Sequence, residues 1–85
     1  PAYFSDCAKV DNSIVADGCV VEGDVEDSVI FRGVKVQPGA ELKQVVALQD
    51  CVIGEGAHIE CAVLDKEVVV RLNPSLHIYW HSFKQ

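Results

Sequence analysis

Hydrophobic and polar positions recur along the chain in four segments of twelve residues that align without gaps. The segments are VDNSIVADGCVV, VEDSVIFRGVKV, LKQVVALQDCVI and IECAVLDKEVVV, and they start at residues 10, 25, 42 and 59. Short connections that contain Gly or Pro-Gly separate them, as expected where the chain must turn. Such self-similarity at a fixed period predicts a solenoid, in which one small unit is stacked repeatedly.

Five columns of this alignment hold apolar or small residues in nearly every repeat. A single unit has no partner against which to bury these side chains, so the repeats must stack to form one continuous core. We therefore expect these columns to face inward. They are the first (Val10, Val25, Leu42, Ile59), fourth (Ser13, Ser28, Val45, Ala62), sixth (Val15, Ile30, Ala47, Leu64), tenth (Cys19, Val34, Cys51, Val68) and twelfth (Val21, Val36, Ile53, Val70).

The segment Ile53-Gly54-Glu55-Gly56-Ala57-His58, followed by Ile59, has the form of a hexapeptide repeat. Three hexapeptides make a triangular coil of 18 residues, and the spacing of 17 between the later repeats is one residue shorter at one corner. The pattern predicts an all-β fold, a left-handed parallel β-helix of about four coils over residues 1–71. A β-sandwich would alternate hairpin strands rather than copy one strand template. Residues 72–85 diverge from the repeat and are predicted to form an irregular tail or cap, although Leu76 lies where a fifth coil could begin.

Apolar residues also occupy columns that we expect to face outward. Phe31 and Leu48 of the seventh column would lie on adjacent coils, and Lys35 marks the eleventh column as an outer one. Contiguous exposed apolar side chains on a small domain indicate a partner surface. The predicted interface residues are Phe31, Leu48, Val20, Val52 and Val69. The alignment leaves open whether the fifth column (Ile14, Val29, Val46, Val63) faces outward or is partly internal.

Composition narrows the possible partners. The formal net charge is −6, with 13 acidic residues against 7 basic ones, which argues against binding nucleic acid through its phosphates. No apolar run approaches the length of a membrane span, and the first residues lack the features of a secretory signal. The four cysteines show no CxxC spacing, so we expect reduced thiols in a cytoplasmic protein and no metal site.

The ordered stretches at residues 12–23, 25–30, 32–36, 49–57 and 63–66 resemble the C-terminal β-helix of bacterial glucose-1-phosphate adenylyltransferases. The resemblance is closest to the regulatory subunit of glycogen synthesis in low-GC Gram-positive bacteria, and it covers residues 1 to about 71. It departs from the family at Arg71-Leu72-Asn73-Pro74, where another Gly-containing corner is usual.

The resemblance implies that this chain is a regulatory and structural piece of a larger protein. Members of the family join ATP to glucose 1-phosphate in an N-terminal nucleotidyltransferase domain, and nothing here resembles its Gly-rich loop. No catalytic residue and no cofactor is therefore assigned to this chain. The implied partners are its own nucleotidyltransferase domain and a catalytic subunit, in an oligomer. Arg32 and Lys66 are the candidates for contacting an anionic effector.

Three other functions are compatible with a β-helix. A truncated hexapeptide acyltransferase would need a catalytic His, and His58 is the only one within the repeats; we expect it to be a solvated corner residue in a column shared with Asp24 and Glu41. A γ-type carbonic anhydrase would need three His ligands, but His77 and His81 in the tail have no third partner. A free-standing β-helix interaction protein is the third alternative. Asp17, Asp50 and Asp65 are expected to be structural residues that bond nearby backbone amides.

Overall fold

The computed structural model describes residues 1–71, and the predicted tail lies outside the described residues. In these residues every regular element is a strand, and every strand pairing is parallel. Val and Ile dominate the strands because their branched side chains suit a pleated surface. The strands are β1 (Tyr3–Phe4), β2 (Lys9–Asp11), β3 (Ile14–Val15), β4 (Val20–Val21), β5 (Asp24–Glu26), β6 (Val29–Ile30), β7 (Lys35–Val36), β8 (Glu41–Ala47), β9 (Val52–Ile53), β10 (His58–Leu64) and β11 (Val69–Val70).

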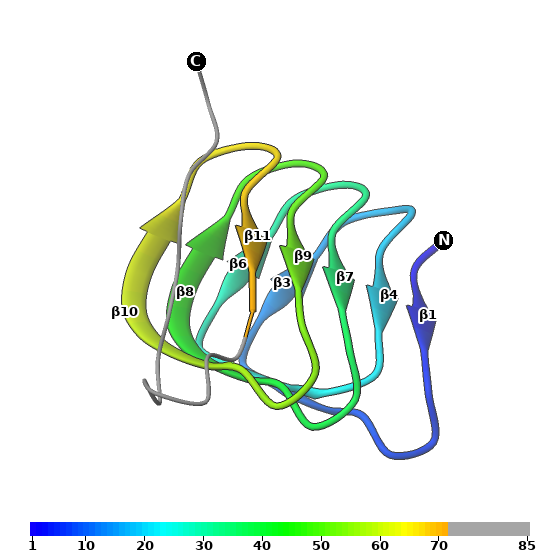
Figure 1. Cartoon of the computed structure of the whole chain (residues 1–85). Helices are drawn as coiled ribbons and strands as arrows, with labels where there is room; N and C mark the ends of the chain where they lie inside the picture. Colours follow the sequence, from blue (N-terminus) through cyan, green and yellow to red (C-terminus); the bar gives the residue numbers. More distant parts are fainter. Residues whose placement is uncertain (72–85) are drawn as a thin grey trace.

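The strands stack into a solenoid whose successive coils lie side by side (Figure 1). One sheet has the order β1-β4-β7-β9-β11. The second has the order β2-β5-β8-β6-β3, with β10 paired to β8. The long strands β8 and β10 each span two sides of the coil, whereas the first two repeats divide the same stretch into β2 and β3, and β5 and β6. The predicted parallel β-helix of about four coils is confirmed.

The register between coils follows the sequence repeat. Val21 pairs with Val36, Val36 with Ile53, and Ile53 with Val70, so that the twelfth column forms a continuous internal ladder. Backbone hydrogen bonds join the coils at the same level, for example from the amide of Lys35 to the carbonyl of Cys51 at 2.9 Å. Equivalent residues of adjacent coils therefore lie directly above one another, roughly 4.8 Å apart.

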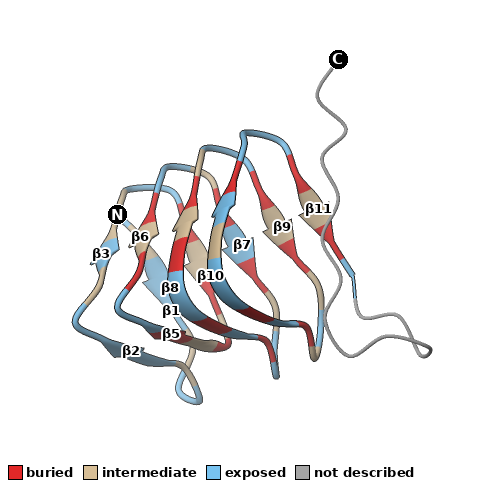
Figure 2. Ribbon diagram, turned by 90° about the vertical axis from the view of Figure 1, so that its left-hand side faces the viewer, coloured by how far each residue is buried: buried red, intermediate tan, exposed pale blue. Residues whose placement is uncertain are grey.

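The core lies inside the coils, where buried positions alternate with exposed or half-buried ones along the strands from β4 onward, apart from the bends within β8 and β10 (Figure 2). All five columns predicted to face inward do so, and only their members near the N-terminal end and Ala62 are less than fully buried. Burial of each Val or Ile side chain contributes roughly 1.5–3 kcal/mol. Ser28 is the only buried polar residue in the part of the chain that the structure describes.

A left-handed backbone conformation recurs at two corners of every coil. The third column has positive φ in all four repeats: Asn12, Asp27, Gln44 and Cys61. The ninth column, Gly18, Gly33, Asp50 and Glu67, has it as well. The first column faces inward, so strict alternation would turn the third column inward as well. The positive φ of the third-column residue bends the chain at that point, and the fourth column faces the core instead. This bend fixes the direction of the columns that follow.

Candidate functional site

The bend after the third column turns the whole fifth column outward. Ile14 pairs with Val29, Val29 with Val46, and Val46 with Val63, which makes an unbroken ladder of β-branched apolar side chains across β3, β6, β8 and β10. We call these four residues the apolar ladder. Its end members Ile14 and Val63 are 68% and 70% exposed, and Val29 and Val46 are half-buried because their neighbours flank them. The question left open by the sequence is thus settled in favour of an outer position.

Phe31 and Leu48 extend the apolar ladder toward the next corner. Each directly follows a strand residue of the core, Ile30 and Ala47, which are paired with one another. Phe31 is 42% exposed and Leu48 is half-buried. These two of the predicted interface residues therefore lie on the same side of the coil as the apolar ladder.

The other three predicted interface residues lie on a different side. Val20, Val52 and Val69 belong to β4, β9 and β11 of the other sheet, and Lys35 of β7 lies between Val20 and Val52 in the same column. All three are half-buried, and Lys35 is exposed. A turn separates this column from Phe31 and Leu48, so the five residues form two surfaces rather than one.

The third side of the coil is charged. Its outer positions on β2, β5, β8 and β10 form two ladders, which are Lys9, Asp24, Glu41 and His58, and Asp11, Glu26, Lys43 and Glu60. His58 begins β10 rather than occupying a corner, and its Nε2 lies 3.8 Å from Oε2 of Glu41. Both side chains are about half exposed, so this contact contributes little to stability.

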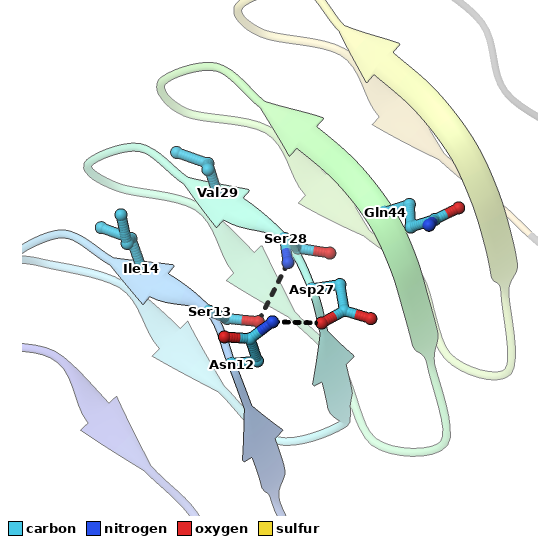
Figure 3. A pocket seen from close by; sticks show the side chains of 7 residues that line it. All are labelled: Asn12, Ser13, Ile14, Asp27, Ser28, Val29 and Gln44. Carbon is cyan, nitrogen blue, oxygen red and sulfur yellow. Dashed lines mark hydrogen bonds between the residues drawn. The ribbon is translucent and has the colours of Figure 1, made fainter.

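A shallow, open hollow lies at the corner between the charged side and the apolar ladder (Figure 3). It is lined by Asn12, Ser13, Ile14, Asp27, Ser28, Val29 and Gln44. The side chain of Asn12 donates a hydrogen bond to Asp27, and the hydroxyl of Ser13 accepts one from the amide of Ser28 at 3.0 Å. These polar groups already satisfy one another, which favours a structural role for the corner.

The candidate effector residues Arg32 and Lys66 share the eighth column, with Gln49 of the intervening repeat between them. At the usual strand spacing their Cα atoms are roughly 10 Å apart. Acidic residues lie close to both: Glu67 directly follows Lys66, and the amide of Asp50 donates a hydrogen bond to the carbonyl of Arg32 at 3.0 Å. The arrangement differs from a convergent clamp in which two cations hold one phosphate.

Asp65 and Cys51 have contacts that indicate structural roles. Asp65 accepts a hydrogen bond from the amide of Lys66 at 2.7 Å, as predicted for an Asp at a strand end. Burial raises the pKa of the Cys51 thiol, which donates to the carbonyl of Asp65. Within residues 1–71 no three His, Cys, Asp or Glu side chains are grouped closely enough to hold a metal ion. His77 and His81 lie outside the described residues.

The described part of the chain has no helix with the length and apolar character needed to cross a membrane.

Comparison with known proteins identifies a matching family and several similar proteins. The family described as "GlmU-like, C-terminal hexapeptide" matches residues 3–78. Glucose-1-phosphate adenylyltransferases of Bacillus thuringiensis (strain Al Hakam) and Bacillus mycoides (strain KBAB4) are each 40% identical to this chain over 70 residues. The matched region is 82% of this chain but only 19% of each relative, so the chain spans about a fifth of their length. No solved structure gives a significant match. Because the family match covers most of its length, the chain belongs to the GlmU-like C-terminal hexapeptide family.

Proposed function

We propose that this chain is the β-helix module of a glucose-1-phosphate adenylyltransferase subunit of glycogen synthesis, a cytoplasmic oligomeric protein. In this proposal the module does no chemistry. It packs against the nucleotidyltransferase domain of its own polypeptide. ADP-glucose is then formed from ATP and glucose 1-phosphate either by that domain or by a catalytic subunit with which it assembles. The identity of 40% to the adenylyltransferases supports the family of the parent protein. The share of 19% supports the view that the catalytic machinery lies elsewhere.

The observation that carries the packing role is the apolar ladder together with Phe31 and Leu48. It is an uninterrupted apolar strip on one side of the coil, whereas the charged side contains Lys, Asp and Glu at nearly every outer position. Water contact with such a strip is unfavourable, and burial of its exposed part would yield about 25 cal/mol per Å². The occupant we propose is the nucleotidyltransferase domain of the same polypeptide. Its covalent connection gives it a high effective concentration at this surface.

The regulatory part of the proposal concerns Arg32 and Lys66. Two cationic residues whose Cα atoms are separated by two strand spacings, roughly 10 Å, suit the two ends of an anion with separated charged groups better than a single phosphate. Replacement of either cation by Ala in the parent enzyme should raise the effector concentration needed for half-maximal response. If Arg32→Ala and Lys66→Ala both leave that concentration unchanged, this part of the proposal fails, and the packing role is unaffected.

The first experiment is the size and activity of the natural polypeptide that contains this sequence. An antibody to this domain should detect, in a lysate of source cells, a band several times larger than the 9.3 kDa of this chain. The immunopurified protein, with any associated subunit, should form ADP-glucose from ATP and glucose 1-phosphate. A band near 9.3 kDa, or a larger protein without this activity, would overturn the proposal and favour a free-standing interaction protein.

The docking surface is tested with Phe31→Glu, Leu48→Glu and Val63→Asp. These side chains are exposed or half-buried in the isolated chain. The variants should therefore have the same β-strand circular dichroism spectrum as the unsubstituted chain and nearly the same midpoint of thermal unfolding. In the parent protein the same changes should loosen domain or subunit packing, seen as faster proteolysis between domains. Gln44→Glu, which adds a carboxylate beside the strip without replacing an apolar group, is the matched control. Unfolding of the isolated chain by the variants would mean that these side chains belong to the core.

A further inference from the structure

The N-terminal end of the solenoid is open, and its core is uncovered there. We call β1, β2 and β3, residues 3–15, the N-terminal rim. Phe4 of the rim is paired with Val21, and Val10 with Val25. Phe4 and Val10 are 45% and 38% exposed, whereas Val21 and Val25, one coil further on in the same inward columns, are 0% and 1% exposed. Residues of these two columns are therefore buried in the inner coils but partly exposed to solvent at the rim.

Exposed apolar side chains are concentrated at this end. Of the large hydrophobic residues that are exposed within residues 1–71, four belong to the rim and two to the rest: Tyr3, Phe4, Val10 and Ile14 against Phe31 and Val63. In Figure 2 the β2 strand is exposed along its whole length, whereas β5 behind it carries a buried residue. An end of this kind on a β-helix needs a cap, because stacked repeats have no self-contained terminal unit.

The rim is also an edge of both sheets. β1 ends one sheet, and β2 and β3 end the two arms of the other. The amides of Tyr3, Lys9 and Ile14 donate to the next coil, at 2.8, 3.3 and 3.0 Å. In a parallel sheet, successive residues of a strand direct their backbone groups to opposite neighbours. The intervening residues Phe4, Val10 and Val15 consequently direct theirs toward the open end, where they offer an edge for pairing.

The chain itself indicates which segment lies nearest to this edge. Pro1 lies at the rim, two residues before β1 (Figure 1). Any residues that precede Pro1 in a longer polypeptide must leave from the open end. The relatives are about five times longer than the matched region, so such a polypeptide has ample chain for a cap. A tethered segment has a local concentration in the millimolar range, which favours it over a second copy of the solenoid.

We propose that the segment immediately before Pro1 in the parent polypeptide caps the N-terminal rim. It places apolar side chains over Phe4 and Val10, and its backbone bonds to the free edge of β1 or β2. The inference rests on the proposed function, because it requires a longer polypeptide. It goes beyond that function by assigning the cap to a specific segment and a specific end, distinct from the apolar ladder.

The test is hydrogen–deuterium exchange of the natural polypeptide compared with the 85-residue chain. Peptides that cover residues 3–15 should exchange at least tenfold more slowly in the natural polypeptide, because a cap would bond their free edge. Peptides that cover β7 and β9, paired on both sides in either form, should exchange at similar rates. Equal exchange of residues 3–15 in the two forms would overturn the inference. A natural polypeptide of 9.3 kDa would overturn both this inference and the proposed function.

The two proposals fail separately in the remaining outcomes. Protection of the rim in a longer polypeptide without adenylyltransferase activity would support the cap and refute the proposed function. Adenylyltransferase activity without protection of the rim would support the proposed function and refute the cap.

A matched pair of substitutions in β2 adds a second readout. Val10→Ser removes an inward apolar group, and Lys9→Ser alters its outward neighbour in the same strand. Val10→Ser should accelerate exchange of residues 3–15 severalfold more in the natural polypeptide than in the 85-residue chain, and Lys9→Ser should have no such difference. An equal effect of Val10→Ser in the two forms would show that no cap packs on Val10.

Discussion

The hydroxyl of Ser28 bridges two coils at a bend of the backbone. The hydroxyl oxygen accepts a hydrogen bond from the amide of Val45 at 3.1 Å, and the hydroxyl hydrogen is donated to the carbonyl of Glu26 at 2.8 Å. Ser13, one repeat earlier, makes the same pair of contacts, with the amide of Ser28 and the carbonyl of Asp11. The fourth column thus uses a side chain to satisfy backbone groups at the corner where the third-column residue interrupts the strand.

Ser28→Ala should lower the free energy of unfolding by about 1–3 kcal/mol, because it leaves the amide of Val45 without a partner in a buried place. Ser28 is only 3% exposed, so water cannot easily replace the hydroxyl. Ser13→Ala is the control, and it should cost less because Ser13 is half-buried at the open rim. Urea unfolding followed by circular dichroism measures both. Equal costs would show that water reaches the amide of Val45 as readily as it reaches the rim.

Gly23 and Gly18 occupy different environments, and we expect substitution to be costly at Gly23 and tolerated at Gly18. A methyl group on Gly23 would lie 2.5 Å from the carbonyl oxygen of Ala40 and 2.9 Å from that of Gln37, which are backbone atoms that cannot move aside. Gly23→Ala should therefore destabilise by about 1–3 kcal/mol or more, as overpacking does.

Gly18 has a φ of 78°, but a methyl group there would make only an ordinary van der Waals contact, 3.8 Å from the amide nitrogen of Gly33. The equivalent positions in later repeats hold Asp50 and Glu67 with positive φ. Gly18→Asn should change the free energy of unfolding by less than about 1 kcal/mol, because Asn tolerates this conformation. Thermal unfolding of the two variants side by side gives the comparison. A Gly18→Asn cost as large as that of Gly23→Ala would mean that the backbone at Gly18 needs more than its φ.

The repeat alone was sufficient to predict the core, because stacking requires equivalent residues to share an environment. The first, fourth, sixth, tenth and twelfth columns face inward as expected. The register between coils could also be predicted, because the twelve-residue segments align without gaps. The difference between spacings of 15 and 17 residues lies in the connecting turns.

The outer surfaces were harder to predict, because they depend on one backbone angle. The side of the fifth column follows from the positive φ of Asn12, Asp27, Gln44 and Cys61. Asn and Asp gave a usable signal, since both are enriched in that conformation, but Gln and Cys are not. The separation of Val20, Val52 and Val69 from Phe31 and Leu48 also depends on which side of a corner each column lies, and sequence spacing does not determine that.

The four cysteines should divide into two pairs by reactivity. All are free thiols; Cys7 and Cys61 are exposed, and Cys19 and Cys51 are buried in the tenth column. A thiol must reach solvent as a thiolate to react, so Ellman's reagent should label Cys7 and Cys61 rapidly. Cys19 and Cys51 should react only as fast as the coils open, and all four should react at once in denaturant. Peptide mass spectrometry after a brief reaction identifies the labelled sites, and rapid labelling of Cys51 would contradict its burial.

Stability should fall in alkaline solution because of Cys51. Burial raises the pKa of this thiol above its ordinary value of 9.0, so the folded chain keeps the proton when the unfolded chain has already lost it. The contribution is complete below pH 9.0 and decreases as the pH rises from there toward the folded pKa. One such group gives a slope of at most about 1.4 kcal/mol per pH unit. Urea unfolding at a series of pH values from 8 to 10.5 measures it.

Cys51→Val should flatten this slope, because Val34 and Val68 in the same column show that the site accepts the larger side chain. Val34→Ala is the control for destabilisation in general: it should lower the free energy of unfolding at every pH and leave the slope as it is in the parent chain. If Cys51→Val keeps the parental slope, the alkaline loss of stability arises from other groups that titrate in this range. If Val34→Ala flattens it as well, the slope depends on how tightly this column packs rather than on the ionisation of one thiol.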